Sequence, residues 1–298
     1  MERPRLSPKK GPPLSKITPT IITLLILAAC TTACHDSNTA HNAPASAPTT
    51  EKGPEGPKLL IYCGITMVKP MRELADNFER SHHCTVIMNQ GGSEDLYQSL
   101  RYSKKGDLYL PGSESYRAKH LAEGLLLDCV YVGFNQAALV VPKGNPRNIQ
   151  PTLDCLLNRS LAVVIGNPES CSIGKQSSII LKKAGIFDQV VDNCFSLAAD
   201  SRNLNKLLRD GSADVMLNWR ATGFFPENTA FVEVLDLPES VSPKKKLVLN
   251  LLSCAGEPEL AREFMNYASS EKGQSVFRKW GFLTDEPVDQ ERMLEGLD

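Results

Sequence analysis

The chain has 298 residues, 9 of them cysteine, and a formal net charge of −1 at pH 7. A nearly neutral chain without dense Lys/Arg clusters lacks the positive surface that nucleic acids require, which argues against nucleic acid as a partner. The length is sufficient for a large core, either in one compact unit or in two domains of ordinary size.

Residues 1–58 predict export rather than a folded domain. Basic residues precede an apolar run from Ile17 to Ala29, which is too short to span a bilayer but has the length of an export-signal core. The run ends in Leu-Ala-Ala-Cys30, which resembles the lipobox of bacterial lipoproteins. We therefore expect residues 1–29 to be a signal peptide and Cys30 to carry lipid. Residues 30–58 predict a flexible linker that tethers an extracytoplasmic protein to the membrane.

The rest of the chain alternates short apolar strands with amphipathic helices. Strands are expected at Leu59–Tyr62, Thr85–Met88, Asp107–Leu110, Ala137–Val141, Leu161–Ile165, Cys194–Leu197 and Ala213–Leu217. Helices are expected at Val68–Glu79, Glu94–Tyr102, Ser115–Glu123, Ser172–Ala184 and Arg202–Arg209. This alternation predicts an α/β fold of mostly parallel sheets with helices on both faces, in which ligands bind beyond the carboxyl ends of the strands.

The stretch Asn89–Tyr97 combines a strand end, a glycine turn and a helix start. Gly91 and Gly92 allow the turn, and Ser93 is suited to the beginning of a helix. The first N–H groups of a helix have no intrahelical partner and can hold an anion, although an ordinary capped turn has the same sequence. Similar strand ends occur at Cys63–Thr66, Gly166–Gly174 and Asp200–Ser201. Together they predict a cavity rich in neutral donors, which suits a small oxyanion.

Five stretches resemble, in order and spacing, the molybdate-type periplasmic substrate-binding proteins of ABC importers. They are Leu60–Thr66, Gly91–Ser93, Gly106–Leu110, Gly166–Lys175 and Ala213–Trp219, and the resemblance extends over Leu59–Leu283. It implies a type II fold of two lobes. Lobe one would comprise residues 59–133 plus 248–298, and lobe two residues 134–247. The chain would cross between the lobes near 130–135 and again near 245–249.

In that family, two hydroxyls, two backbone amides and a tyrosine hydroxyl hold the oxyanion. Matched by position, Thr66 and Ser93 supply the hydroxyls and Ile173 and Ser201 the backbone N–H groups, while Trp219 stands at the tyrosine. Indole donates only, so Trp219 favours a fully deprotonated ligand. The resemblance implies a monomer that captures molybdate or tungstate and delivers it to an importer's permease, with no cofactor, metal or catalysis.

The sequence is also compatible with other ligands. Glu94 and Asp95 would repel a dianion if they faced the cavity, which leaves a cation such as ferric ion possible. Nearby Arg202, Arg220 and Lys175 could offset that repulsion, although solvent-facing charge is the simpler interpretation. A sulfate-like anion, a small organic anion, or a sensor without a transporter also fits the sequence.

The remaining features of the sequence are its cysteines and the catalytic motifs that it lacks. An exported chain permits disulfides among the cysteines other than Cys30. Cys63 and Cys171 fall in predicted cleft loops, where they could bind a soft metal or join the lobes, but simple structural roles are more economical. The Gly174-Lys175 pair lacks P-loop spacing, and no hydrolase or dinucleotide motif is present, so no enzymatic activity is expected.

Overall fold

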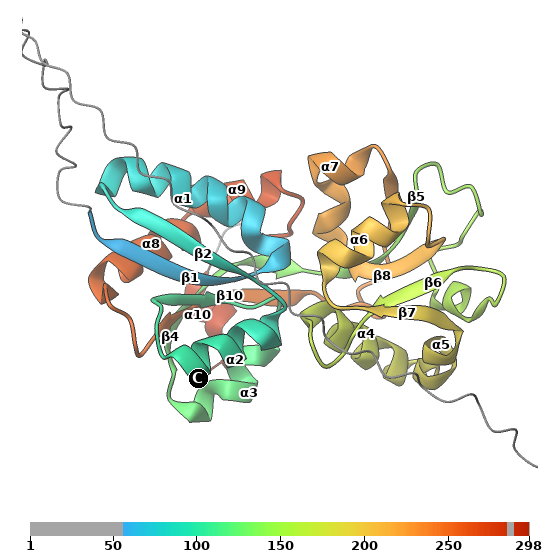
Figure 1. The fold of residues 1–298 in the computed structure, drawn as a ribbon, viewed down its shortest axis with the longest axis horizontal. Coiled ribbons are helices and arrows are strands. Elements are labelled where there is room, and N and C mark those ends of the chain that lie inside the picture. The colour runs from blue at the N-terminus through green and yellow to red at the C-terminus, as the bar shows by residue number, and fades with distance from the viewer. Residues whose placement is uncertain (1–55, 285–288, 298) are drawn as a thin grey trace, which may run out of the picture. The chain divides into compact units, whose positions relative to one another are not determined.

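The computed structural model describes residues 56–284 and 289–297, and the strands of this part of the chain form two five-stranded sheets (Figure 1). The predicted signal peptide, Cys30 and nearly all of the predicted linker lie outside the described residues. None of the described helices is long and apolar enough to cross a membrane.

The first sheet has the strand order β2-β1-β3-β10-β4. Its strands are β1 (Lys58–Gly64), β2 (Thr85–Gly91), β3 (Leu108–Leu110), β4 (Leu126–Asn135) and β10 (Lys245–Leu252). Alternate residues of β1 face opposite sides, as expected for a strand that is covered on both faces. Leu59, Ile61 and Cys63 pack into a core with α1 (Val68–His82), whereas Tyr62 packs into a second core with α2 (Ser93–Ser103). We call this sheet and its helices lobe one.

The helices of lobe one come from both ends of the described chain. They are α1 (Val68–His82), α2 (Ser93–Ser103), α3 (Ser115–His120), α8 (Pro258–Ser269), α9 (Glu271–Lys279) and α10 (Gln290–Leu294). Two 3-10 turns, η1 (Ile65–Met67) and η2 (Leu121–Glu123), precede α1 and follow α3.

The second sheet has the strand order β7-β6-β8-β5-β9, and we call it and its helices lobe two. Its strands are β5 (Ala137–Pro142), β6 (Val163–Gly166), β7 (Cys194–Ala198), β8 (Val215–Trp219) and β9 (Val232–Leu235). Its helices are α4 (Ser172–Lys183), α5 (Phe187–Asn193), α6 (Ser201–Arg209) and α7 (Pro226–Thr229), with 3-10 turns η3 (Leu153–Leu157) and η4 (Arg220–Phe224).

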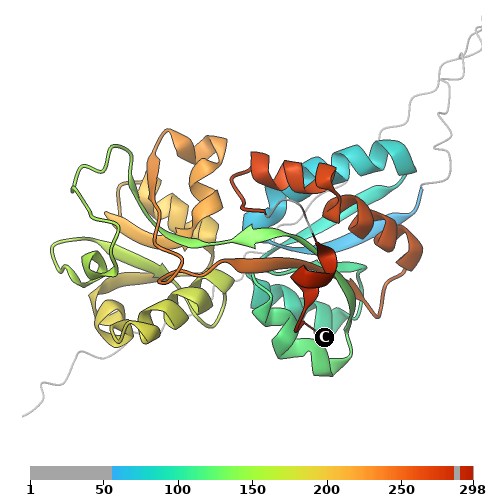
Figure 2. The ribbon, with the colours of Figure 1, turned by 180° about the vertical axis from the view of Figure 1, so that it is seen from behind.

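The α/β class predicted from the sequence is confirmed, but the sheets are mixed rather than mostly parallel. Each sheet has two parallel and two antiparallel pairings, and the antiparallel ones involve β10 in lobe one and β5 in lobe two. The reason is the path of the chain. β4 passes into β5 with only Gln136 between them, and β10 returns from lobe two alongside β4. Figure 2 shows the two crossing segments, light green and brown, side by side.

The parallel strands place four helix starts at the facing edges of the two sheets. In lobe one, β1 leads through η1 into α1, and β2 leads into α2 across a single residue, Gly92. In lobe two, α4 follows β6 and α6 follows β7 after short turns. This arrangement determines which residues can meet between the lobes.

Candidate functional site

Four hydroxyl side chains line one small cavity between the lobes. Thr66 and Ser93 come from lobe one, and Ser172 and Ser201 come from lobe two. All four residues are buried. The cavity has a volume of about 10 Å³. That is room for about one water molecule, so a five-atom oxyanion requires the walls to stand further apart than they do here.

Each of the three serines is the first residue of a helix. Ser93 begins α2, Ser172 begins α4 and Ser201 begins α6, while Thr66 lies in the turn before α1. The first N–H groups of a helix have no intrahelical acceptor, and the helix dipole adds partial positive charge at the same end. The cavity therefore lies at the first residues of three α-helices and at the turn η1, which is a favourable environment for an anion.

Two of the hydroxyls are held by neutral N–H donors. The Gly112 N–H donates to Ser93 Oγ at 3.0 Å, and Trp219 Nε1 donates to Ser172 Oγ at 3.2 Å. Each bond occupies an acceptor site of the serine oxygen and leaves its own O–H group available. Both serines can therefore donate into the cavity.

Buried polar side chains fix the backbone around these serines. The Tyr109 hydroxyl donates to the Ser93 carbonyl oxygen at 2.8 Å, and Asn218 Nδ2 donates to the Ser201 carbonyl oxygen at 3.2 Å. Burial raises the pKa of Tyr109 well above its ordinary value, so its hydroxyl stays a donor at any physiological pH. The serines are thus positioned by the protein before any ligand arrives.

The two lobes touch directly at the cavity. Thr66 Oγ1 donates to Ser201 Oγ at 3.2 Å across the cleft. A Cβ atom on Gly112 would lie 2.1 Å from Ser172 Oγ, and one on Gly92 would lie 2.5 Å from the Ser170 carbonyl oxygen. Only glycine at these two positions allows the lobes to approach so closely.

No charged side chain lines this cavity. Glu94, which could have repelled an anion, instead receives a hydrogen bond from Lys119 Nζ at 2.8 Å. Burial alone would raise the pKa of the Glu94 carboxyl, but the bond from Lys119 holds that pKa below its ordinary value. The repulsion considered from the sequence therefore does not involve Glu94 in this arrangement.

None of the three cations considered from the sequence lines this cavity, and Arg202 donates to the neutral Gln90 Oε1 at 2.9 Å. Arg220 pairs with Asp236 at 2.9 Å, and Lys175 Nζ lies over the Tyr116 ring, 4.9 Å from its centroid. An anion in the small cavity would therefore be held by neutral donors.

Three of the five residues predicted to bind ligand line the cavity, and two do not. Thr66, Ser93 and Ser201 meet there. The Ile173 side chain packs in the core of lobe two, and its N–H group is the second of α4. Trp219 is fully buried and its indole N–H is used by Ser172. It therefore acts on the cavity through a serine rather than directly.

Ser172 lines the cavity although it was not among the residues predicted from the sequence. It lines the cavity as Ser93 and Ser201 do, and like them it is the first helical residue after a strand-end turn. That shared position is the signal that would have identified it.

The two cleft-loop cysteines lie in different environments. Cys63 is in the core of lobe one, where burial raises the pKa of its thiol, and Cys171 lines the cavity, where burial raises its thiol pKa to about 11. Neither forms a disulfide. No group of three or more His, Cys, Asp or Glu side chains in residues 56–284 and 289–297 could hold a metal ion.

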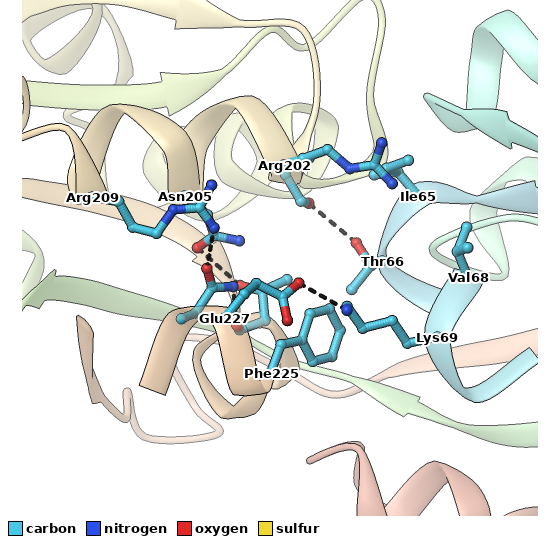
Figure 3. Close-up of a pocket in the computed structure, with 12 residues that line it drawn as sticks. Ile65, Thr66, Val68, Lys69, Arg202, Asn205, Arg209, Phe225 and Glu227 are labelled. Carbon is cyan, nitrogen blue, oxygen red and sulfur yellow. Dashed lines mark hydrogen bonds and ion pairs between the residues drawn. The ribbon is translucent and has the colours of Figure 1, made fainter. Parts of the chain in front are cut away.

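A larger pocket adjoins the cavity and shares three of its walls, Ile65, Thr66 and Ser201. Its volume is about 290 Å³. Figure 3 shows Lys69 of lobe one facing Arg209 and Glu227 of lobe two across this space. Lys69 and Glu227 form an ion pair of 3.0 Å that joins the lobes.

Comparisons with known proteins agree with this geometry. The family model described as bacterial extracellular solute-binding protein matches residues 59–283. A protein of Haemophilus influenzae described as a binding protein is 24% identical over 225 residues, which is 76% of this chain and 90% of that protein.

Two solved structures share the fold. The sulfate-binding protein of Mycobacterium tuberculosis superposes with a TM-score of 0.69 at 17% identity, covering 81% of this chain and 92% of its own. The periplasmic molybdate-binding protein of Azotobacter vinelandii gives 0.66 at 14% identity, covering 76% of this chain and 100% of its own. Together with the family match over most of the described residues, these findings show that the chain belongs to the bacterial extracellular solute-binding protein family.

Proposed function

We propose that this protein captures a small tetrahedral oxyanion, molybdate or tungstate first, and delivers it to the permease of an ABC importer. The predicted lipid on Cys30 would tether it to the membrane outside the cytoplasm, and the predicted linker would give it reach. The observation that carries the proposal is the cavity, in which four buried hydroxyls and several helix starts converge with no charged side chain.

The chemistry of the cavity supports an anion rather than a cation. A buried anion recovers its lost hydration only when each oxygen meets a donor, and unpaired oxygens cost free energy. The hydroxyls of Thr66, Ser93, Ser172 and Ser201 and the first-turn N–H groups, including that of Ile173, form such a set of donors. The side chains that bind ferric ion, namely Asp, Glu, His and Tyr, are missing from the cavity walls.

Binding would use both lobes. Separation of the lobes about the β4 and β10 crossing admits the anion, and donors from both lobes then favour the closed form. The hydrogen bond between Thr66 and Ser201 spans the cleft, and an oxygen of the ligand would take its place. The walls thereby move apart enough for a guest larger than one water molecule.

Isothermal titration calorimetry with molybdate, tungstate, sulfate and phosphate tests the proposal. We expect at least one of these oxyanions to bind, and Ser93→Ala to weaken that binding about 10- to 150-fold through loss of a hydrogen bond to a charged group. Ser99→Ala is the matched control, because Ser99 is an exposed serine of the same helix whose hydroxyl bonds the Asp95 carbonyl oxygen. Binding of ferric ion or thiamine in place of every oxyanion would overturn the proposal.

A further inference from the structure

The pocket of about 290 Å³ beside the small cavity has its own chemistry. Its polar walls come mainly from one stripe of α6, where Ser201, Asn205 and Arg209 are spaced four residues apart and so face the same way. Ile65, Val68 and Phe225 supply apolar surface. A bare inorganic anion in the small cavity would leave this entire space unused.

The pocket carries more positive than negative charge. Its walls contain Lys69, Arg202 and Arg209 but only one acid, Glu227, which pairs with Lys69. Arg209 donates to Asn228 Oδ1 at 2.7 Å, and Arg202 donates to Gln90 Oε1 at 2.9 Å.

Both partners of these arginines are neutral. No carboxylate of the described residues lies within ion-pair distance of either guanidinium. Each guanidinium is a planar fork that matches a carboxylate, so the pocket offers two positive groups without an acidic partner.

This pocket and the small cavity share three lining residues, Ile65, Thr66 and Ser201. Thr66 and Ser201 line both spaces and bond to each other at 3.2 Å, as the dashed line ending at Thr66 in Figure 3 shows. If ligand oxygens replace this bond, the two spaces become continuous. A ligand could then occupy both at once.

From this adjacency we propose that the pocket is a second subsite, through which the protein also binds a small organic molecule with a tetrahedral oxyanion at one end and a carboxylate at the other. This inference rests on the proposed function, because the oxyanion head would occupy the cavity of hydroxyls and helix starts. The organic body contacts Ile65, Val68 and Phe225, and the carboxylate meets Arg202 and Arg209.

Two pairs of probes test the subsite by calorimetry. In each pair the molecules carry the same oxyanion and only one has a carboxylate: 4-sulfobutanoate against butane-1-sulfonate, and 3-phosphoglycerate against glycerol 3-phosphate. We expect the carboxylate member of at least one pair to bind about tenfold tighter or more, since hydrogen bonds between charged groups are the strong ones. The pair that shows the difference identifies a sulfonate or a phosphate head.

Variants then locate the effect. Arg209→Gln should reduce the advantage of the carboxylate while leaving the affinity for inorganic oxyanions unchanged, because its bond to Asn228 lies within lobe two. Arg202→Gln should reduce the same advantage. Lys206→Gln is the matched control, because it removes one charge from the same helix at an exposed position paired with Asp210, away from the pocket walls. Thermal melting confirms that each variant is folded.

The outcomes separate this inference from the proposed function. Binding of molybdate, tungstate or sulfate with equal affinities within both probe pairs overturns the second subsite and leaves the oxyanion cavity standing. A carboxylate advantage that persists in both arginine variants also overturns it. Tight binding of the elongated acids without binding of any inorganic oxyanion supports the subsite and overturns the choice of an inorganic ligand.

Discussion

Replacing Gly112 by alanine should prevent the two lobes from closing fully around the cavity. The new methyl group would lie 2.1 Å from Ser172 Oγ and 2.8 Å from Ser172 Cβ, whereas ordinary contacts begin at 3.4 Å. Gly112 is not among the residues with positive φ, so alanine fits its backbone. The Cβ atom of the alanine would lie 3.6 Å from Ser93 Oγ, which is an ordinary contact distance. The conflict is therefore between the lobes and not within lobe one.

We expect the Gly112→Ala substitution to lower the affinity for the ligand and not the stability of the fold. Ser172 must withdraw from the cavity by more than an ångström, which weakens or removes its hydrogen bond to the ligand. Loss of one hydrogen bond to a charged group corresponds to about 1.5 to 3 kcal/mol, or about 10- to 150-fold in affinity. The open form avoids the clash, and alanine restricts the unfolded chain, so the melting temperature should stay the same or rise slightly.

Calorimetry with the oxyanion that the wild type binds most tightly measures this effect. Gly256→Ala is the control, because Gly256 has no positive φ and a Cβ atom there would meet only Asp107 Oδ1 at 3.9 Å. If Gly112→Ala binds the oxyanion with wild-type affinity, then Ser172 does not lie close to Gly112 in the ligand-bound form. The arrangement of donors described above would then be wrong.

Three further predictions concern the walls of the cavity. Ser172→Ala should weaken oxyanion binding as strongly as Ser93→Ala, about 10- to 150-fold by calorimetry, and unchanged affinity would remove Ser172 from the site. Trp219→Phe removes the N–H donor to Ser172, so it should weaken oxyanion binding and lower the unfolding free energy by at least about 1 kcal/mol in urea denaturation. A loss of stability without a loss of affinity would mean that the indole does not orient the serine. The folded-state pKa of Glu94 lies below its ordinary 4.5, so the stability that its charged form contributes is present above that pH and is lost as the pH falls. The melting temperatures of wild type and Glu94→Gln should therefore converge below pH 4.5. A constant difference would show that the bond from Lys119 does not stabilise the charged form.

The sequence predicted those strands and helices that depend on the periodicity of neighbouring apolar residues. The apolar run at the start of lobe one and the helix through Met71, Leu74 and Phe78 were both located within a few residues of β1 and α1. Long-range pairing was not visible in this way. β10, whose residues Val248 to Leu252 are all buried, is defined by its antiparallel partners β3 and β4, which come from distant parts of the chain. No local signal reports such a pairing.

The candidate site was predictable where it depended on strand ends. Ser93 follows a glycine turn and Ser201 follows Asp200, which caps α6 through the Asn203 N–H group, and both residues lie at the cavity. The role of Trp219 could not be derived from the sequence, because it depends on how β8 lies against the first turn of α4. The same holds for the charge of the larger pocket, which residues from both lobes create together.

The pairing of the two crossing strands limits how the protein can move. Lys245 pairs with Asn135, Lys246 with Phe134 and Leu247 with Gly133, so the two connections form a hydrogen-bonded ribbon and not two independent tethers. A ribbon bends and twists, but it resists sliding one lobe past the other. In the proposed opening and closing of the lobes, each closure would therefore return the serines to the same register, with little loss of conformational entropy.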